Sequence, residues 1–281
     1  APSWPACWWT NSTSKPVRQL PSAVPDHLYY YDLAGNLVSS IVNDAITVFR
    51  YNAQNKLARI EGQGFSYDFL YDSRNRRVGV CRNNEDWRCD IHDGAVCIAT
   101  VSNGIINRFF VRGVGIAEGT GDVLAEIDVS AEAPVPHYYV SNHRGDTVVT
   151  LTDAGTVDCY RHYEAFGVAL TNIGTFTPLY TFSTKEYLPD AKLYIYAYRV
   201  YDPVAGRWTQ RDPIDYQDSV NLYCFCGNTP AAVVDIDGRV DCALVAAGLI
   251  GGGTIVVLIA YSRVNIAPDA WLVGRCSAYA V

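Results

Sequence analysis

Between residues 27 and 82, apolar and polar residues alternate in short runs that end in Tyr-Asp or Tyr-Asn. Alternation of this kind is typical of β-strands with one buried face. Each of the first two runs is followed by a few polar residues and then by a second apolar run, which starts at Leu37 or Leu57. The pattern therefore predicts a series of β-hairpins.

The hairpins repeat with a period of twenty residues. The positions that define the repeat are Tyr31, Asp32, Gly35, Tyr51, Asn52, Asn55, Tyr71, Asp72 and Asn75. In each unit the Asp or Asn side chain is expected to cap a turn, and the Gly or Asn three residues later to take the left-handed conformation. A lone hairpin cannot bury its own face, so we expect neighbouring hairpins to stack edge to edge.

The second half of the chain carries an ordered series of further motifs. They lie at residues 137–147, 152–157, 163–167, 182–186, 194–203, 206–208, 211–214, 221–223 and 227–230. Together with the Tyr-Asp units, they resemble the RHS family, in which YD repeats precede an RHS repeat-associated core. The resemblance covers about residues 27 to 240. It implies an all-β fold of stacked hairpins that form a curved antiparallel sheet, a partial shell or spiral, with a short apolar C-terminal tail.

We divide the chain into a polar leader (1–26), a YD-repeat sheet (27–136), an RHS core (137–240) and an apolar tail (241–281), and we expect one continuous sheet from 27 to 240. Residues 243–260 are only Ala, Leu, Val, Gly, Ile and one Thr, a length that just reaches the membrane-span threshold. A triple glycine at 251–253 interrupts this run, and residues 254–259 are strand-like. A buried or partner-inserted segment is therefore favoured over a membrane span.

Composition narrows the function further. The chain has 281 residues with a net charge of −7, which argues against a nucleic-acid partner. Tyr is unusually frequent, with 20 copies, and suits half-buried pleated surfaces. The sequence lacks dinucleotide, P-loop, serine-hydrolase and zinc-site patterns, so neither a cofactor nor a metal is expected.

Cysteine usage and one sequon favour an extracellular, secreted protein. The chain has 9 Cys, an odd number, so at least one thiol stays free or pairs between chains. Cys81, Cys89 and Cys97 lie eight apart around a polar loop and are candidates for a local disulfide. Asn11, in Asn11-Ser12-Thr13, is a candidate glycosylation site.

The family resemblance also implies a self-cleaving site that works like an aspartic protease at the end of the core. The matching residues are Asp212 and Asp235, with Arg211 in support, and the bond is Arg239-Val240. Two carboxylates that share one proton can divide the general acid and base roles. The family pattern is Asp-Pro-x-Gly-Leu, from which this chain departs with Ile236 and Arg239. The alternative is that both aspartates only cap turns. Any enzymatic activity would therefore be at most autoproteolytic.

Three hypotheses for the function remain. Three YD repeats and a core make only a partial shell, with open edges and an exposed concave apolar face. Open edges are templates for pairing with other chains. The first hypothesis is therefore a secreted structural module that self-assembles with copies of itself into a fibre or tube. The second is the C-terminal shell and self-cleaving core of a larger RHS toxin-carrier protein, whose remaining shell would be its partner. The third is a cell-surface adhesion module.

Overall fold

The structure is a computed structural model that describes residues 27–115, 119–130, 132–217, 219–239, 241–246 and 257–260. For 241–246 and 257–260 it describes the backbone only. The candidate glycosylation site Asn11, with the rest of the leader 1–26, and Val240 of the candidate cleaved bond lie outside the described residues.

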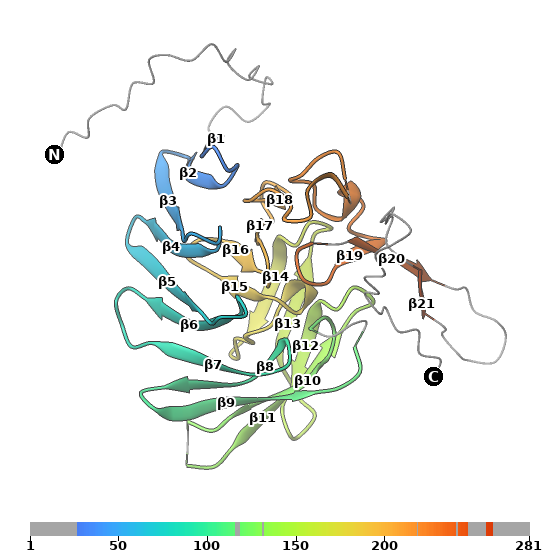
Figure 1. Ribbon diagram of the computed structural model, residues 1–281. Helices are drawn as coiled ribbons and strands as arrows, with labels where there is room; N and C mark the ends of the chain where they lie inside the picture. Colours follow the sequence, from blue (N-terminus) through green and yellow to red (C-terminus); the bar gives the residue numbers. More distant parts are fainter. Residues whose placement is uncertain are drawn as a thin grey trace, which may run out of the picture.

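Fourteen strands form one antiparallel sheet, in which the order of the strands is their order in the chain. Their bounds are β1 His27–Tyr31, β2 Leu37–Val42, β3 Ala45–Tyr51, β4 Leu57–Gly62, β5 Phe65–Tyr71, β6 Arg77–Arg82, β7 Arg88–Asp93, β8 Val96–Ser102, β9 Ile105–Arg112, β10 Val123–Asp128, β11 Val135–Ser141, β12 Thr147–Leu151, β13 Val157–Tyr163 and β14 Ala169–Gly174. The sheet curves round an interior and stays open, with β1 and β14 as its edges (Figure 1). The expected all-β, curved antiparallel fold is confirmed.

The turn of each predicted repeat has one geometry. In the second unit, Asn52 N–H donates to the Lys56 carbonyl at 2.8 Å, and Asn55 N–H donates to the Asn52 carbonyl at 3.0 Å. The Asn52 side chain accepts from the Lys56 N–H at 2.9 Å, and Asn55 has a φ of 56°. The turns at 32–36 and 72–76 match it, with positive φ at Gly35 and Asn75. The repeat positions therefore have the roles that the sequence predicted.

The repeat tyrosines join one hairpin to the next. The Tyr51 hydroxyl donates to the Leu37 carbonyl at 3.0 Å, and the Tyr71 hydroxyl donates to the Leu57 carbonyl at 2.8 Å. Each bond reaches back to the first residue of a strand in the preceding unit. The tyrosine thus fixes the spacing between hairpins as well as packing its ring.

Three more turns of this type lie at 142–146, 152–156 and 164–168. In each, the first N–H donates to the fifth carbonyl, and Gly145, Gly155 or Gly167 supplies the positive φ. The tripeptide Arg144-Gly145-Asp146 belongs to the first of these turns, with both charged side chains buried and paired at 2.6 Å. The repeat architecture therefore extends into the predicted core.

The sheet ends at Gly174, so the expectation of one continuous sheet to residue 240 is wrong. A four-stranded sheet follows, made of β15 Glu186–Leu188, β16 Leu193–Ile195, β17 Val200–Asp202 and β18 Arg207–Trp208. A third sheet consists of β19 Val233–Asp235, β20 Asp241–Ala246 and β21 Val257–Ala260. Three short 3₁₀ turns complete the elements: η1 Phe182–Thr184, η2 Asp215–Gln217 and η3 Cys226–Asn228.

The four-stranded sheet covers the concave side of the curved sheet, so that face is not exposed as expected (Figure 1). One core joins the two sheets and contains Leu37, Phe49, Leu57, Ile60, Tyr67, Phe69, Val80, Leu188, Leu193 and Val200. A second, aromatic core contains Tyr163, Phe182, Tyr194, Tyr196, Tyr201, Trp208, Phe225 and Cys226. Five of the 20 tyrosines are therefore buried in these two cores.

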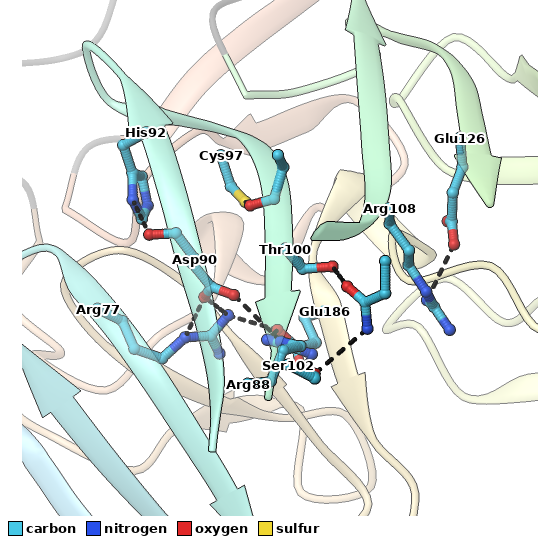
Figure 2. Close-up of polar contacts among 12 residues, drawn as sticks. Arg77, Arg88, Asp90, His92, Cys97, Thr100, Ser102, Arg108, Glu126 and Glu186 are labelled. Carbon is cyan, nitrogen blue, oxygen red and sulfur yellow. Dashed lines mark hydrogen bonds and ion pairs between the residues drawn. The ribbon is translucent and has the colours of Figure 1, made fainter. Parts of the chain in front are cut away.

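A buried ion cluster also ties the small sheet to the curved one. Glu186 on β15 accepts from Arg88 on β7 through both oxygens, at 2.9 and 2.8 Å, and pairs with Arg77 on β6. Asp90 pairs with both arginines, at 3.0 and 3.1 Å. Figure 2 shows these four side chains converging between the strands. Two cations and two anions therefore balance in a buried site.

The local disulfide expected among Cys81, Cys89 and Cys97 is absent. All three are thiols: Cys81 donates to the Glu85 carbonyl at 3.0 Å, Cys97 donates to the Ala99 carbonyl at 3.2 Å, and Cys89 is exposed. The two buried thiols find their partners in their own strand or the following turn. The cysteine argument for an oxidising compartment loses this support.

The apolar run at 243–260 is described only at its two ends. Residues 243–246 belong to β20, which pairs with β21 at 257–260, whereas 247–256 lie outside the described residues. Among the described residues, no helix is long and apolar enough to cross a membrane.

Candidate functional site

Two loops of the core lie side by side and bring the candidate residues together. One is 196–199, between β16 and β17; the other is 235–239, which follows β19. Tyr198 N–H donates to the Asp237 carbonyl at 3.0 Å. The Arg199 Nε–H donates to the Gly238 carbonyl at 2.6 Å. The side chain of Arg199 thus reaches the peptide two residues before Val240.

Arg199 lies between the two predicted carboxylates. Its Nη1 is 2.8 Å from Asp212 Oδ2, and its Nη2 is 3.2 Å from Asp235 Oδ2. All three side chains are buried, with Arg199 only 2% exposed. Trp208 covers the guanidinium, whose carbon is 4.1 Å from the ring. One cation therefore holds Asp212 and Asp235 in a shared, water-poor environment.

Asp235 is held by the chain that follows it. Its Oδ1 accepts N–H bonds from Asp237 at 3.2 Å, Gly238 at 2.7 Å and Arg239 at 3.2 Å. Burial raises the pKa of Asp235 to about 7, and it outweighs the opposing effect of Arg199. Asp235 therefore caps its turn and also has a raised pKa. A carboxyl with this pKa can hold or release a proton near neutral pH.

Asp212 is positioned by a different element. Its N–H donates to the Leu222 carbonyl at 3.0 Å, and its Oδ1 accepts from the Ile214 N–H at 2.9 Å. Asp212 and Asp235 therefore come from separate segments of the core, and each also caps its own turn. The structure brings these two predicted residues together.

Sequence reasoning missed Arg199 and named Arg211 in its place. Arg211 forms an exposed ion pair with Asp215 at 3.1 Å, and its aliphatic stem lies against the turn at Gly35. The guanidinium that contacts both carboxylates is that of Arg199. A signal for it exists in the sequence: a lone arginine in the aromatic run 194–201 must find buried partners.

The repeat turns support the loop at 196–199 from the curved sheet. Lys56, the last residue of the second turn, donates from Nζ to the Ala197 carbonyl at 2.9 Å. Gln210 donates to the Asn55 carbonyl of the same turn at 2.5 Å. A YD-repeat turn is therefore part of the framework of the candidate site.

The proteins similar to this chain include a toxin subunit and a surface protein. No family model matches the chain. It is 26% identical to toxin subunit YenC1 of Yersinia entomophaga over 233 residues. This match covers 74% of the present chain and 23% of YenC1. It is 29% identical over 135 residues to salivary gland surface protein 1 of Aedes aegypti, which covers 46% of the chain and 4% of that protein.

Solved structures show the same fold. The crystal structure of TcdB2-TccC3 matches with a TM-score of 0.56 and 16% identity, over 75% of this chain and 13% of that chain. A Photorhabdus luminescens Tc holotoxin pore matches with a TM-score of 0.54, also at 16% identity over 75% of this chain and 13% of that chain. The chain spans less than a quarter of the length of each relative named here.

Proposed function

We propose that this chain is the C-terminal shell and self-cleaving core of a larger RHS-type toxin-carrier protein. The similarity to toxin subunit YenC1 and the fold shared with TcdB2-TccC3 support this reading over the self-assembling fibre. The rest of the shell would pair with the open strand β1, where the sheet would continue. The contact of Arg199 with both Asp212 and Asp235, next to the bond after Arg239, carries the proposal of self-cleavage.

The proposed reaction is hydrolysis of the Arg239-Val240 peptide bond. The ionised carboxylate of Asp212 takes a proton from a water molecule, whose oxygen bonds to the Arg239 carbonyl carbon. The carbon–nitrogen bond then breaks, and the protonated carboxyl of Asp235 gives its proton to the Val240 nitrogen. The products are a carboxyl group on Arg239 and an amino group on Val240. In this proposal Arg199 pairs with Asp212 at 2.8 Å, and burial raises the pKa of Asp235 to about 7, so that Asp235 can carry a proton near neutral pH.

The test is intact-mass analysis of the 281-residue chain after expression and incubation at pH 6 to 7. The wild type should yield fragments 1–239 and 240–281. Asp212→Asn and Asp235→Asn should leave the chain whole, since each removes one partner of the acid–base pair. Arg199→Lys should slow cleavage, because an ammonium cannot span both carboxylates with the same geometry.

A matched control is Asp202→Asn. Asp202 is also a partly buried aspartate whose Oδ1 caps a turn, accepting from Val204 and Ala205 at 2.9 and 3.0 Å, and burial raises its pKa. This variant should cleave like the wild type. An uncut wild-type chain, or equal cleavage in all aspartate variants, would refute the proposed activity.

The adhesion hypothesis has a narrower basis. The similarity to a salivary gland surface protein favours it over less than half of the chain. The tripeptide Arg144-Gly145-Asp146 offers no adhesive surface, because both of its charged side chains are buried. Secretion is part of both proposals, and detection of the chain outside the producing cells would test it.

A further inference from the structure

The residue before the proposed cleaved bond is an arginine, and a dedicated site receives its side chain. Asp237 Oδ2 accepts from Arg239 Nε at 3.0 Å and from Nη2 at 2.6 Å. The carbon of the guanidinium lies 3.8 Å from the centre of the Tyr198 ring. A carboxylate and an aromatic face are the two groups that bind guanidinium best.

Both partners of Arg239 lie on the two loops that carry Arg199 and Asp235. Tyr198 immediately precedes Arg199, and its N–H bonds to the carbonyl of Asp237. Gly238 has a φ of 89°, and a side chain there would lie 3.2 Å from Arg199 N and Tyr196 Cβ. The close approach at Gly238 lets the backbone turn so that Arg239 points back over Tyr198.

A second cation, Lys56, lies at the same ring. Lys56 Nζ lies 4.5 Å from the centre of the same Tyr198 ring, and burial together with the nearby Arg239 lowers the pKa of Lys56 to about 8. If Arg239 were replaced, Lys56 would remain as a cation near the carboxylate of Asp237. An apolar side chain at position 239 would leave Asp237 without the two hydrogen bonds that Arg239 now donates to it.

We propose that Asp237 and Tyr198 form a specificity site that selects arginine at the residue whose carbonyl is cleaved. This inference rests on the proposed self-cleavage and deepens it. It gives the departure from the apolar residue of the family pattern a physical role. The charge that would be costly in an apolar pocket is here met by a carboxylate and a ring.

The experiment is a double-mutant cycle on the first-order rate of self-cleavage in the full chain. We expect Asp237→Asn, Tyr198→Ala and Arg239→Leu each to slow cleavage by about tenfold, and Arg239→Lys by less, because the ammonium keeps one ion pair and the ring contact. In the Arg239→Leu background, Asp237→Asn should change the rate by less than about twofold, since its partner is already gone. Arg82→Leu is the matched control: it removes an arginine from a partly exposed ion pair outside the site, with Asp190 at 2.8 Å, and it should cleave like the wild type.

The outcomes are distinguishable. Suppose that the wild type cleaves, and that Asp237→Asn slows cleavage equally in the wild-type and Arg239→Leu backgrounds or slows it in neither. The specificity site is then refuted, while the self-cleavage remains. If no variant cleaves, including the wild type, both ideas fall. Circular dichroism and thermal unfolding of each variant will show whether it is folded. Because Asp237 and Tyr198 are both partly exposed, we expect their variants to fold.

Discussion

Replacement of Glu186 by Gln tests whether the buried ion cluster holds the small sheet inside the curved one. Glu186 is 6% exposed and is the only one of the four clustered residues that comes from the small sheet. Gln keeps the size and one acceptor oxygen but leaves Arg77 and Arg88 with the single carboxylate of Asp90. Removal of one partner from a buried ion pair costs about 3 to 5 kcal/mol.

The pKa of Glu186 gives a second estimate of how much its charge contributes to the free energy of unfolding. Burial alone would raise the pKa of Glu186, but Arg77 and Arg88 outweigh it and hold the pKa at about 2. A folded pKa below the ordinary value of 4.5 means that the contribution is complete above about pH 5 and is lost as the pH falls toward 2. A difference of this size corresponds to about 3 kcal/mol, in agreement with the mutational range.

The assay is urea unfolding followed by tryptophan fluorescence at pH 7 and pH 3. Glu186→Gln should lower the free energy of unfolding by about 3 to 5 kcal/mol at pH 7, and the gap to wild type should narrow by about 2 kcal/mol at pH 3. Asp190→Asn is the control: its partner Arg82 is half exposed, so the cost should stay below about 1 kcal/mol. Equal costs for the two variants, or a gap independent of pH, would refute the reasoning.

Two further predictions concern the carboxyl of Asp235 and the repeat turns. Burial raises the pKa of Asp235 to about 7, so folding takes up a proton between about pH 4 and 7. In urea titrations, the free energy of unfolding of the wild type relative to Asp235→Asn should therefore fall by roughly 2 to 3 kcal/mol from pH 5 to 8. No change would show that Asp235 is ionised throughout this range. Gly155→Ala should lower the free energy of unfolding by about 1 kcal/mol, because Gly155 has a φ of 75° that a residue with a side chain adopts at a cost. The added methyl meets open space, so no clash adds to this cost. Gly35→Ala should cost clearly more by the same unfolding assay, because its methyl would lie 2.4 Å from Arg211 Cδ and 2.6 Å from the Tyr223 hydroxyl, and equal costs would contradict this account.

The sequence allowed the stacked hairpins and the first three turns to be predicted because each depends on local chemistry, whereas the curvature of the sheet was implied by the family resemblance. A tyrosine, a capping side chain and a residue that tolerates positive φ suffice for each turn. The later turns were missed as repeats because Asn142, Thr152 and Glu164 replace the Tyr-Asp pattern while the backbone bonds stay the same. The turn is thus defined by its hydrogen bonds and its glycine more than by its first residue.

The interior could not be predicted from local patterns. The covering of the concave face depends on contacts between β2–β6 and β15–β17, which are distant in the sequence. In the same way, adjacency favoured Arg211 as the partner of Asp212, whereas the fold supplies Arg199 from another loop. A single sequence identifies which charges must be paired, but the pairing itself is a property of the packed core.

The sequential order of the fourteen strands has a consequence for biosynthesis. Each strand pairs with the one just made, so the curved sheet can grow strand by strand as the chain leaves the ribosome. The bonds from Lys56 to Ala197 and from Gln210 to Asn55 bridge 141 and 155 positions, and can form only after the interior strands have been translated. The loop that carries Arg199 is thereby secured late. A bond-cutting centre assembled in this order would act only on chains whose shell is already filled, so that cleavage would report completed folding.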